Sequence, residues 1–315
     1  MDQLPEKFPA SRVLTETDNS YVHAATSENT RMAYQSDIKH FLSQGNELPA
    51  TPETVECYLK ACATEYNPRT LIRRVTALRQ WHKLQGCEDP TQNPLVVKTL
   101  RGIARLHGRP KKQAIALRLE DLDRLVTHLK ANGALKSTRN RALLLVGFFG
   151  AFRRSELVSL KWGQVSFLSD GMIITLPRSK TDQTGEGAPC VIPFGNETRC
   201  PVRALIDWRQ ASKQWDGFIF RRISKTGNLS QEAICAHHLN RLIKALVKEV
   251  GLLYADQYSS HSSRRGFATE AARLGASMPA IQRHGRWRST KTVVEYVEAG
   301  RQFADSAVNV LFDFK

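Results

Sequence analysis

The sequence predicts a mainly helical protein of two domains, in which an N-terminal helical bundle precedes an α+β domain with a small antiparallel β-sheet. Three observations support this prediction: residues 27–106 have helical periodicity and no convincing strand, residues 107–113 are basic and lack apolar side chains, and short alternating or β-branched runs occupy 164–194. A polar segment with a breaker pair is typical of a linker. We therefore expect a polar leader at 1–26, the bundle at 27–106, the linker at 107–113 and the second domain at 114–315.

The helices predicted for the bundle have conventional start and stop residues. The first begins at Ser27, a residue that can cap a helix, and ends at Gly45. Proline is tolerated in the first turn of a helix, so we place the next three starts at Pro52, Pro68 and Pro94. The third of these helices carries several arginines, which gives the bundle basic faces.

Helical and strand patterns both occur in the second domain. We expect helices at residues 119–132, 136–152, 202–214, 231–250, 262–274 and 290–299, followed by an apolar segment at 303–314. We expect three short strands at 164–168, 172–176 and 190–194. A chain of 315 residues is long enough to give each domain its own core.

The net charge indicates a partner that carries phosphates. Forty-six Lys and Arg against 30 Asp and Glu give a formal charge of +16, as in proteins that neutralise nucleic acid. Charge alone does not exclude a merely soluble basic protein. The scattered cysteines form no CxxC pair, so neither a disulfide framework nor a zinc site is expected.

The sequence also predicts where the protein is found. Its richest apolar run, residues 142–152, is too short to cross a bilayer. The first residues lack the basic and apolar regions of a secretory signal. We expect a cytoplasmic protein without a membrane partner, associated with the nucleoid.

Several residues suit phosphodiester cleavage, which without a metal needs a nucleophile, cations around the phosphoryl oxygens and an acid for the leaving oxygen. Tyr296 is the candidate nucleophile if cations activate its hydroxyl, whose ordinary pKa is about 10. Arg153 ends the most apolar helix, and Arg264 follows His261 by three residues on a helix. Arginine forks bind phosphate well, although an isolated His–Arg pair at this spacing is commonly an ordinary surface feature.

Two further residues have plausible supporting roles in such a site. Glu156 can orient the nearby Arg153. Lys180 lies between two predicted strands, where a hairpin tip could carry it to a leaving oxygen. An ordinary solvated lysine in a turn is the alternative for Lys180.

In this order and spacing, these residues resemble those of the tyrosine recombinase (integrase) family. Residues 150–157 resemble the first arginine box, residues 261–266 resemble the HxxR box, and the remaining matches are Lys180, Trp287 and Tyr296. The resemblance covers nearly the whole chain. Tryptophan instead of histidine at 287, together with residues 218–227, makes the chain most similar to Cre-like members.

The chain departs from the family pattern near Trp287. Arg286 stands where a glycine is common. His284 could be mistaken for the third-box histidine, but it precedes Tyr296 by twelve residues and Trp287 precedes it by nine. The spacing argues for Trp287 in that role.

The resemblance implies a site-specific DNA recombinase that cleaves and rejoins strands. Tyr296 would attack the scissile phosphate and form a 3′-phosphotyrosyl link, while Arg153 and Arg264 hold the phosphoryl oxygens. Lys180 would protonate the 5′-oxygen, and His261 would assist proton transfer.

The resemblance also implies how the enzyme assembles and what it needs. Trp287 would donate its indole N–H to the phosphate. No cofactor, metal or ATP would be required, because the covalent link stores the energy of the broken bond. Four protomers on two sites in double-stranded DNA with inverted repeats would exchange strands pairwise. The apolar segment 303–314 would pass to a neighbouring subunit as a trans contact; packing on its own domain is the alternative.

The bundle and the second domain, joined by the linker, could together clamp duplex DNA. The candidate DNA-binding residues are Arg69, Arg73, Arg74, Arg79, Lys111 and Lys112. Two alternative functions stay open at this point: a type IB topoisomerase-like enzyme, which needs no pairing of two sites, and a non-catalytic architectural DNA-binding protein.

Overall fold

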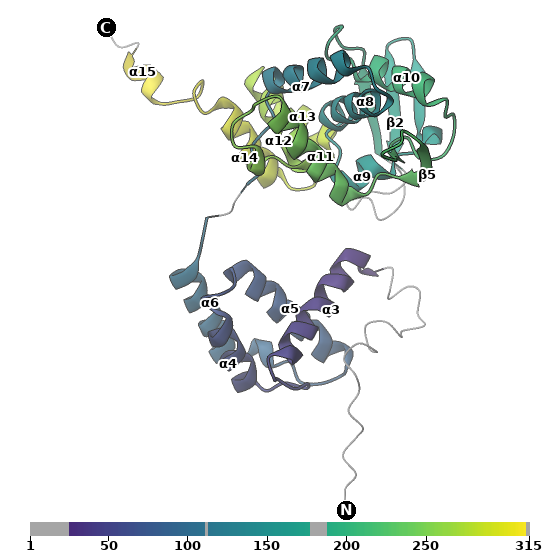
Figure 1. Cartoon of the computed structure of the whole chain (residues 1–315). Coiled ribbons are helices and arrows are strands. Elements are labelled where there is room, and N and C mark those ends of the chain that lie inside the picture. Colours follow the sequence, from purple (N-terminus) through teal and green to yellow (C-terminus); the bar gives the residue numbers. More distant parts are fainter. Residues whose placement is uncertain (1–24, 111–112, 177–187, 313–315) are drawn as a thin grey trace, which may run out of the picture. The chain divides into compact units, whose positions relative to one another are not determined.

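The computed structural model describes residues 25–110, 113–176 and 188–312. It divides into two compact units, Met1–Lys111 and Lys112–Lys315, and the division falls inside the basic segment 107–113. Figure 1 labels the helices and strands of both units. The second unit carries most of the residues with candidate chemistry.

The first unit consists of helices around one apolar core. Its elements are α3 (Glu28–Ser43), α4 (Pro52–Cys62), α5 (Pro68–Leu84), the short 3₁₀ helix η1 (Pro90–Gln92) and α6 (Pro94–His107). The predicted starts at Pro52, Pro68 and Pro94 are confirmed, and in each case the preceding Thr or Asn side chain accepts a backbone N–H of the first turn. Buried residues of the core include Phe41, Leu59, Leu71, Leu78 and Val96.

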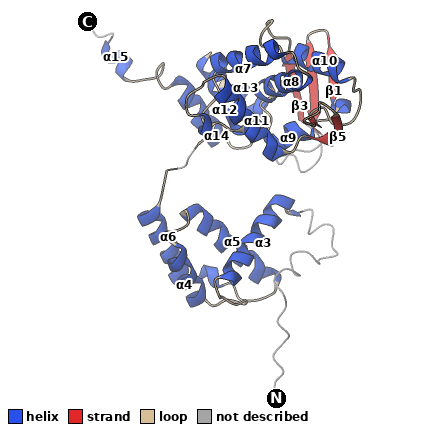
Figure 2. Ribbon diagram, in the orientation of Figure 1, coloured by secondary structure: helices blue, strands red, loops and turns tan. Residues whose placement is uncertain are grey.

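The second unit combines helices with a small antiparallel sheet, as the sequence predicts for its fold class, and with a second, two-stranded sheet that was not predicted (Figure 2). The helices of its first half are α7 (Leu119–Asn132), α8 (Leu135–Phe149), α9 (Arg154–Ser159), η2 (Trp162–Gln164) and α10 (Pro201–Ser212). Those of its second half are α11 (Ala236–Glu249), η3 (Ala255–Gln257), α12 (Ser260–Arg273), α13 (Met278–Gly285), α14 (Thr290–Arg301) and α15 (Val308–Phe312).

The larger sheet is antiparallel in the order β1-β2-β3. Its strands are β1 (Val165–Leu168), β2 (Gly171–Leu176) and β3 (Ala188–Pro193). Ile174 in the middle strand lies opposite Val165 on one side and Cys190 on the other. Helix α10 packs against β3 and against α8, so the sheet and the central helix share one core.

Helix α8 is the centre of the second unit. Nearly every side chain from Ala142 to Phe148 is buried, because α7, α10 and α12 all pack against it. This packing explains the apolar run at 142–152, which belongs to a core helix. None of the helices in the described part of the chain is long and apolar enough to cross a membrane.

Two sequence expectations about local structure are corrected. The helix expected at 231–250 begins only at Ala236, because residues 229–233 form β5 (Leu229–Ala233), which pairs with β4 (Arg221–Ile223). Strand pairing overrides the local helical pattern there. Helix α8 ends at Phe149, three residues earlier than expected, because Ala151 has a φ of +46° and so leaves the right-handed helical region.

Candidate active site

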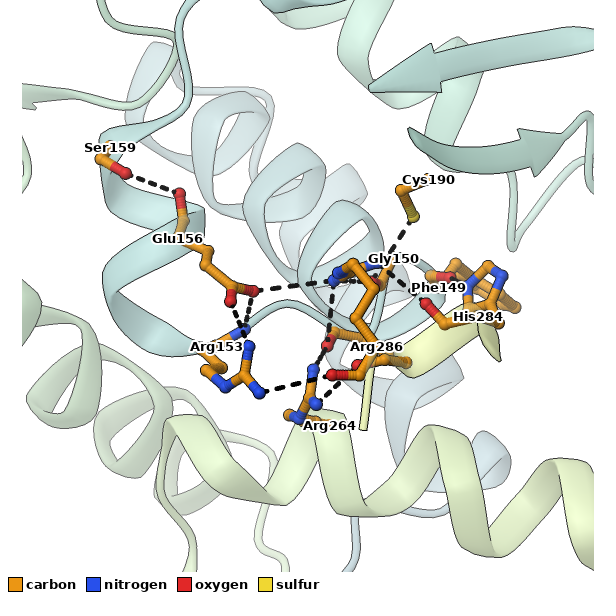
Figure 3. A network of polar contacts seen from close by, with 11 residues as sticks. Phe149, Gly150, Arg153, Glu156, Ser159, Cys190, Arg264, His284 and Arg286 are labelled. Carbon is orange, nitrogen blue, oxygen red and sulfur yellow. Dashed lines mark hydrogen bonds and ion pairs between the residues drawn. The ribbon is translucent and has the colours of Figure 1, made fainter. Parts of the chain in front are cut away.

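The candidate site is built around the C-terminal end of α8. The last carbonyl groups of a helix lack partners within the helix. Here the carbonyl of Phe149 accepts a hydrogen bond from His284 Nε2 at 2.6 Å, and that of Gly150 accepts one from Arg286 at 2.9 Å. The carbonyl of Ala151 accepts a hydrogen bond from Arg264. Figure 3 shows how these side chains converge on the turn after α8.

Arg153 lies at the start of α9 and is fixed by Glu156. The Glu156 carboxylate accepts from the Arg153 backbone N–H at 2.9 Å and from its guanidinium Nη1 at 2.6 Å. Nη2 of the same guanidinium donates to the carbonyl of Arg286 at 3.4 Å. Glu156 is buried and Arg153 is about one-fifth exposed, so the pair holds a cation at the edge of the protein. The sequence expectation that Glu156 orients Arg153 agrees with these contacts.

The Glu156 carboxylate stays ionised in this setting. Burial alone would raise its pKa, but the hydrogen bonds and charge of Arg153, together with the charge of Arg286, outweigh burial and hold the pKa below its usual value. The negative charge is therefore available at neutral pH to hold both guanidinium groups.

Arg264 is the most buried cation of the site. It lies on α12, donates to the Gly285 carbonyl at 2.6 Å and to the Ala151 carbonyl, and its guanidinium carbon lies 4.1 Å from the centre of the Trp287 ring. Burial and the nearby charge of Arg153 lower the pKa of Arg264 to about 9. The group is still cationic at pH 7, and its charge is shielded little by water.

Tyr296 lies on α14, next to Trp287. The two ring centroids are 5.7 Å apart in an edge-to-face arrangement, and both rings pack on a small cluster that includes Ala268, Ile281 and Val293. Trp287 is therefore in contact with both Arg264 and Tyr296. Because α12 and α14 pack closely, the two helices bring a cation and a phenol to one place.

A second cation approaches Tyr296, one that the sequence interpretation did not single out. Arg265 lies with its guanidinium carbon 6.0 Å from the centre of the Tyr296 ring and donates to the Ala114 carbonyl at 3.1 Å. The sequence signal for this residue was the second arginine of the Arg264–Arg265 pair at the end of the His-x-x-Arg motif. Its adjacency to Arg264 gave no information about which aromatic ring it would face.

The remaining predicted residues have different positions. His261 is on the exposed first turn of α12, one turn before Arg264. Lys180, Lys111 and Lys112 lie outside the described residues. His284, which the spacing excluded as the third-box residue, stacks on Phe267 at 4.6 Å.

The candidate DNA-binding arginines of the first unit differ in exposure. Arg69 is exposed, and Arg73 is half-exposed with a 3.0 Å contact to Asp37. Arg74 is buried against Asp37 and lies 3.9 Å over an aromatic ring. Arg79 is partly exposed and hydrogen-bonds within the same unit. Arg69 and Arg73 are thus charged residues at the surface, whereas Arg74 lies in the interior of the bundle.

The arrangement combines two fixed guanidinium groups, an indole and a phenol within one small region. Preorganised donors of this kind stabilise charge that develops on phosphoryl oxygens. In the described part of the chain, no three His, Cys, Asp or Glu side chains are grouped so that they could hold a metal ion.

The chain is similar to known proteins over most of its length. The phage integrase family matches residues 116–302. The integrase/recombinase xerD homolog of Selenomonas ruminantium is 33% identical over 91% of this chain and 86% of its own length. Recombinase cre of Escherichia phage P1 is 26% identical over 79% of this chain and 76% of its own length.

The fold is shared with solved structures of low sequence identity. The XerH site-specific recombinase, in a post-cleavage complex with a palindromic difH substrate, aligns with a TM-score of 0.68 at 15% identity, covering 90% of this chain and 80% of that one. A lambda integrase dimer bound to a COC′ core site aligns with a TM-score of 0.64, also at 15% identity, over 92% and 77% of the two chains. The family match over more than half of the sequence and the relative at 33% identity together establish that this chain belongs to the phage integrase family of tyrosine recombinases.

Proposed function

We propose that the protein is a site-specific DNA recombinase that cleaves and rejoins strands through Tyr296. The observation that carries this proposal is the row formed by Arg264, Trp287 and Tyr296, with Arg153 hydrogen-bonded to the same loop. The family of the chain supports DNA breaking and rejoining as the activity. A phenol flanked by cations is the nucleophile that such chemistry needs without a metal.

In the proposed reaction, the Tyr296 hydroxyl oxygen attacks the scissile phosphorus, and its proton leaves with the assistance of His261 and returns when the tyrosine is released. A phosphotyrosyl bond forms to the 3′-phosphate, the bond from phosphorus to the 5′-oxygen breaks, and that oxygen takes a proton from Lys180. Arg153 and Arg264 neutralise the phosphoryl oxygens, and Trp287 donates its indole N–H. The 5′-hydroxyl of a second strand then attacks the phosphotyrosyl bond and releases the tyrosine.

The energetics of this exchange favour a reaction without ATP. One ester bond replaces another at each step, so the energy of the broken bond is kept in the enzyme–DNA link. His261 lies one helical turn before Arg264 on the same helix, and we expect it to assist proton transfer. We expect the substrate to be double-stranded DNA with inverted repeats, bound by a tetramer on two sites.

The proposed division of labour assigns 27–106 to DNA clamping and 114–315 to catalysis. The exposed cations Arg69 and Arg73 suit contacts to phosphates. In the second unit, the segment after α14 ends in exposed apolar side chains, among them Phe303 and Phe312. Exposed apolar groups gathered in one short segment are typical of an interface, which supports a trans contact between protomers.

The test of this function is covalent trapping. Purified protein is mixed with a pooled library of nicked duplexes without metal or ATP, and DNA-linked protein is sought on a denaturing gel. We expect an adduct with the wild type and with Tyr254→Phe, a matched control at an exposed tyrosine, but none with Tyr296→Phe. Absence of a wild-type adduct despite tight DNA binding would favour the architectural alternative.

A second arm separates a recombinase from a topoisomerase. The trapped DNA is sequenced, and two plasmids with that site are incubated with the protein. Joined products that carry DNA from both plasmids support recombination. Relaxation of supercoils without joined products would indicate a type IB topoisomerase-like enzyme.

A further inference from the structure

Arg286 is a buried arginine in the turn between α13 and α14, directly before Trp287. Its φ is +56°, in the left-handed region that side chains with a Cβ rarely adopt. Its side chain is only about 6% exposed. A residue held in an unfavourable backbone conformation with a buried charge must be stabilised by its surroundings.

The surroundings of Arg286 supply several partners. Its guanidinium donates to the carbonyls of His284 and Gly150, both at 2.9 Å, and its Nη2 lies 3.5 Å from the carbonyl of Ala151. It also lies 4.8 Å from the centre of the Phe152 ring. Arg286 thus ties the turn that carries Trp287 to the C-terminal end of α8 (Figure 3).

Arg286 is also linked to Arg153 in two ways. Its own carbonyl accepts from Arg153 Nη2 at 3.4 Å, and its guanidinium lies 3.6 Å from the Glu156 carboxylate. Glu156 is the group that holds the Arg153 guanidinium at 2.6 Å. Arg153, Glu156 and Arg286 therefore form one connected group of charges, in which the Glu156 and Arg286 side chains are buried and Arg153 is partly exposed.

From these contacts we propose that Arg286 is a positioning residue of the recombinase: it acts through Glu156 and its own carbonyl to fix the Arg153 fork relative to Trp287. Its guanidinium contacts are with the carbonyls of His284, Gly150 and Ala151 and with the Glu156 carboxylate, all of which belong to the protein. Fixed geometry matters because small displacements of a group that contacts the transition state reduce the rate strongly. The inference rests on the proposed function, since it concerns the rate of Tyr296 attack.

The discriminating variant is Arg286→Gly. Glycine adopts a φ of +56° without strain, so this substitution removes the guanidinium while it relieves the backbone. We expect the maximal rate of adduct formation on the trapped nicked duplex to fall by about 10- to 100-fold. We expect the half-saturating DNA concentration to stay within about twofold, because a positioning group stabilises the transition state and contributes little to ground-state binding.

Two further variants test whether Arg286 acts on Arg153 through Glu156, and they keep the proposal testable if Arg286→Gly fails to fold. Arg286→Lys retains the charge but has no planar fork, so it should restore only part of the rate. In Glu156→Gln with and without Arg286→Lys, the double variant should lose less than the product of the two separate losses, because both residues act on Arg153. The matched control is Arg283→Ala, which removes an exposed arginine from α13 and should leave the maximal rate within about twofold.

Several results would overturn the proposal. These are a wild-type rate in Arg286→Gly or in Arg286→Lys, an equal loss in Arg283→Ala, fully multiplicative losses with Glu156→Gln, or a change only in the half-saturating DNA concentration. Failure of the proposed function is distinct, because it would leave the wild type itself without an adduct. An adduct in the wild type together with any of those results would leave the recombinase function standing and remove only the role of Arg286.

Discussion

At the scale of single residues, the candidate site is organised by backbone carbonyls as much as by acidic side chains. The carbonyls at 149–151 and at Gly285 accept hydrogen bonds from Arg264, Arg286 and His284. The carbonyls at 149–151 are fixed by the end of α8 and that of Gly285 by the end of α13, so the side chains that donate to them are fixed as well. The dipole of α8 adds to the effect, because the C-terminal end of a helix attracts positive charge.

Replacing Arg264 by lysine tests this view. Lysine keeps a charge but cannot donate to the Ala151 and Gly285 carbonyls with one planar fork. We expect the rate of adduct formation to fall about 100-fold or more, and the free energy of unfolding to fall by about 1–3 kcal/mol because a buried carbonyl loses its partner. Adduct kinetics and urea unfolding measure the two effects. Arg273→Lys on the exposed part of α12 is the control, and an equal loss there would contradict the argument.

His284 predicts a pH dependence of stability. Burial, followed by the charges of Arg286 and Arg264, lowers its pKa from 6.5 despite the hydrogen bond to Phe149. A histidine with a lowered folded pKa binds fewer protons in the folded state, so its contribution is present above pH 6.5 and is lost as the pH falls towards the folded pKa. We expect the melting temperature to decline below about pH 6.5, and the decline to be shallower in His284→Gln. Parallel curves for the two proteins would argue against His284 as the cause.

At the scale of elements, the close packing of α12 and α14 places Tyr296 beside the arginines. A Cβ added at Gly300 on α14 would lie 2.3 Å from the Thr269 carbonyl oxygen and 3.2 Å from the Ala272 side chain on α12. A contact of 2.3 Å with backbone cannot be relieved by a side-chain movement. The close approach of α14 to α12, which sets the spacing between Tyr296 and Arg264, therefore depends on glycine at position 300.

Gly300→Ala is expected to separate these helices. We expect a loss of about 1–3 kcal/mol in the free energy of unfolding from overpacking and a reduced rate of adduct formation. The control is Gly102→Ala on α6, where nothing lies within 4 Å of the added Cβ; alanine there should stabilise the bundle by about 0.5–1 kcal/mol. Thermal unfolding and adduct assays of the two variants decide the matter, and a stable, fully active Gly300→Ala would refute this packing argument.

The elements also show what the sequence could predict and what it could not. Local signals located the starts of α4, α5 and α6, because Pro after a capping residue acts within one turn. Strand β5 was missed because the helical pattern was extended back over it, although its partner β4 is a neighbour in a hairpin, with Ile223 opposite Leu229. The role of Arg286, in contrast, was beyond local reasoning: the sequence showed an unusual residue before Trp287, but its carbonyl partners at 150 and 151 are more than 130 positions away.

At the scale of the whole molecule, the basic side chains that give the chain its net charge of +16 include both exposed and buried residues. Exposed and buried arginines should respond differently to substitution. Arg69 is exposed, whereas Arg74 is buried beside Asp37. Arg69→Ala should reduce the salt dependence of DNA binding by about one unit of slope if the residue contacts a phosphate. Arg74→Ala should instead destabilise the first unit by about 1–3 kcal/mol. Binding isotherms at several salt concentrations and urea unfolding separate the two, and the reverse pattern would contradict the assignment.

The segment after α14 gives the last prediction at this scale. Phe303, Leu311 and Phe312 are 79%, 72% and 81% exposed, and burying large apolar side chains is worth about 1.5–3 kcal/mol each. We propose that a second protomer covers these side chains. Deleting residues 303–315 should therefore leave binding to a single DNA site unchanged and impair the joining of two sites. Gel-shift titration with one site and the two-plasmid assay measure these properties. Unchanged joining would mean that the segment packs elsewhere, whereas weakened single-site binding would place it on the DNA or on its own unit.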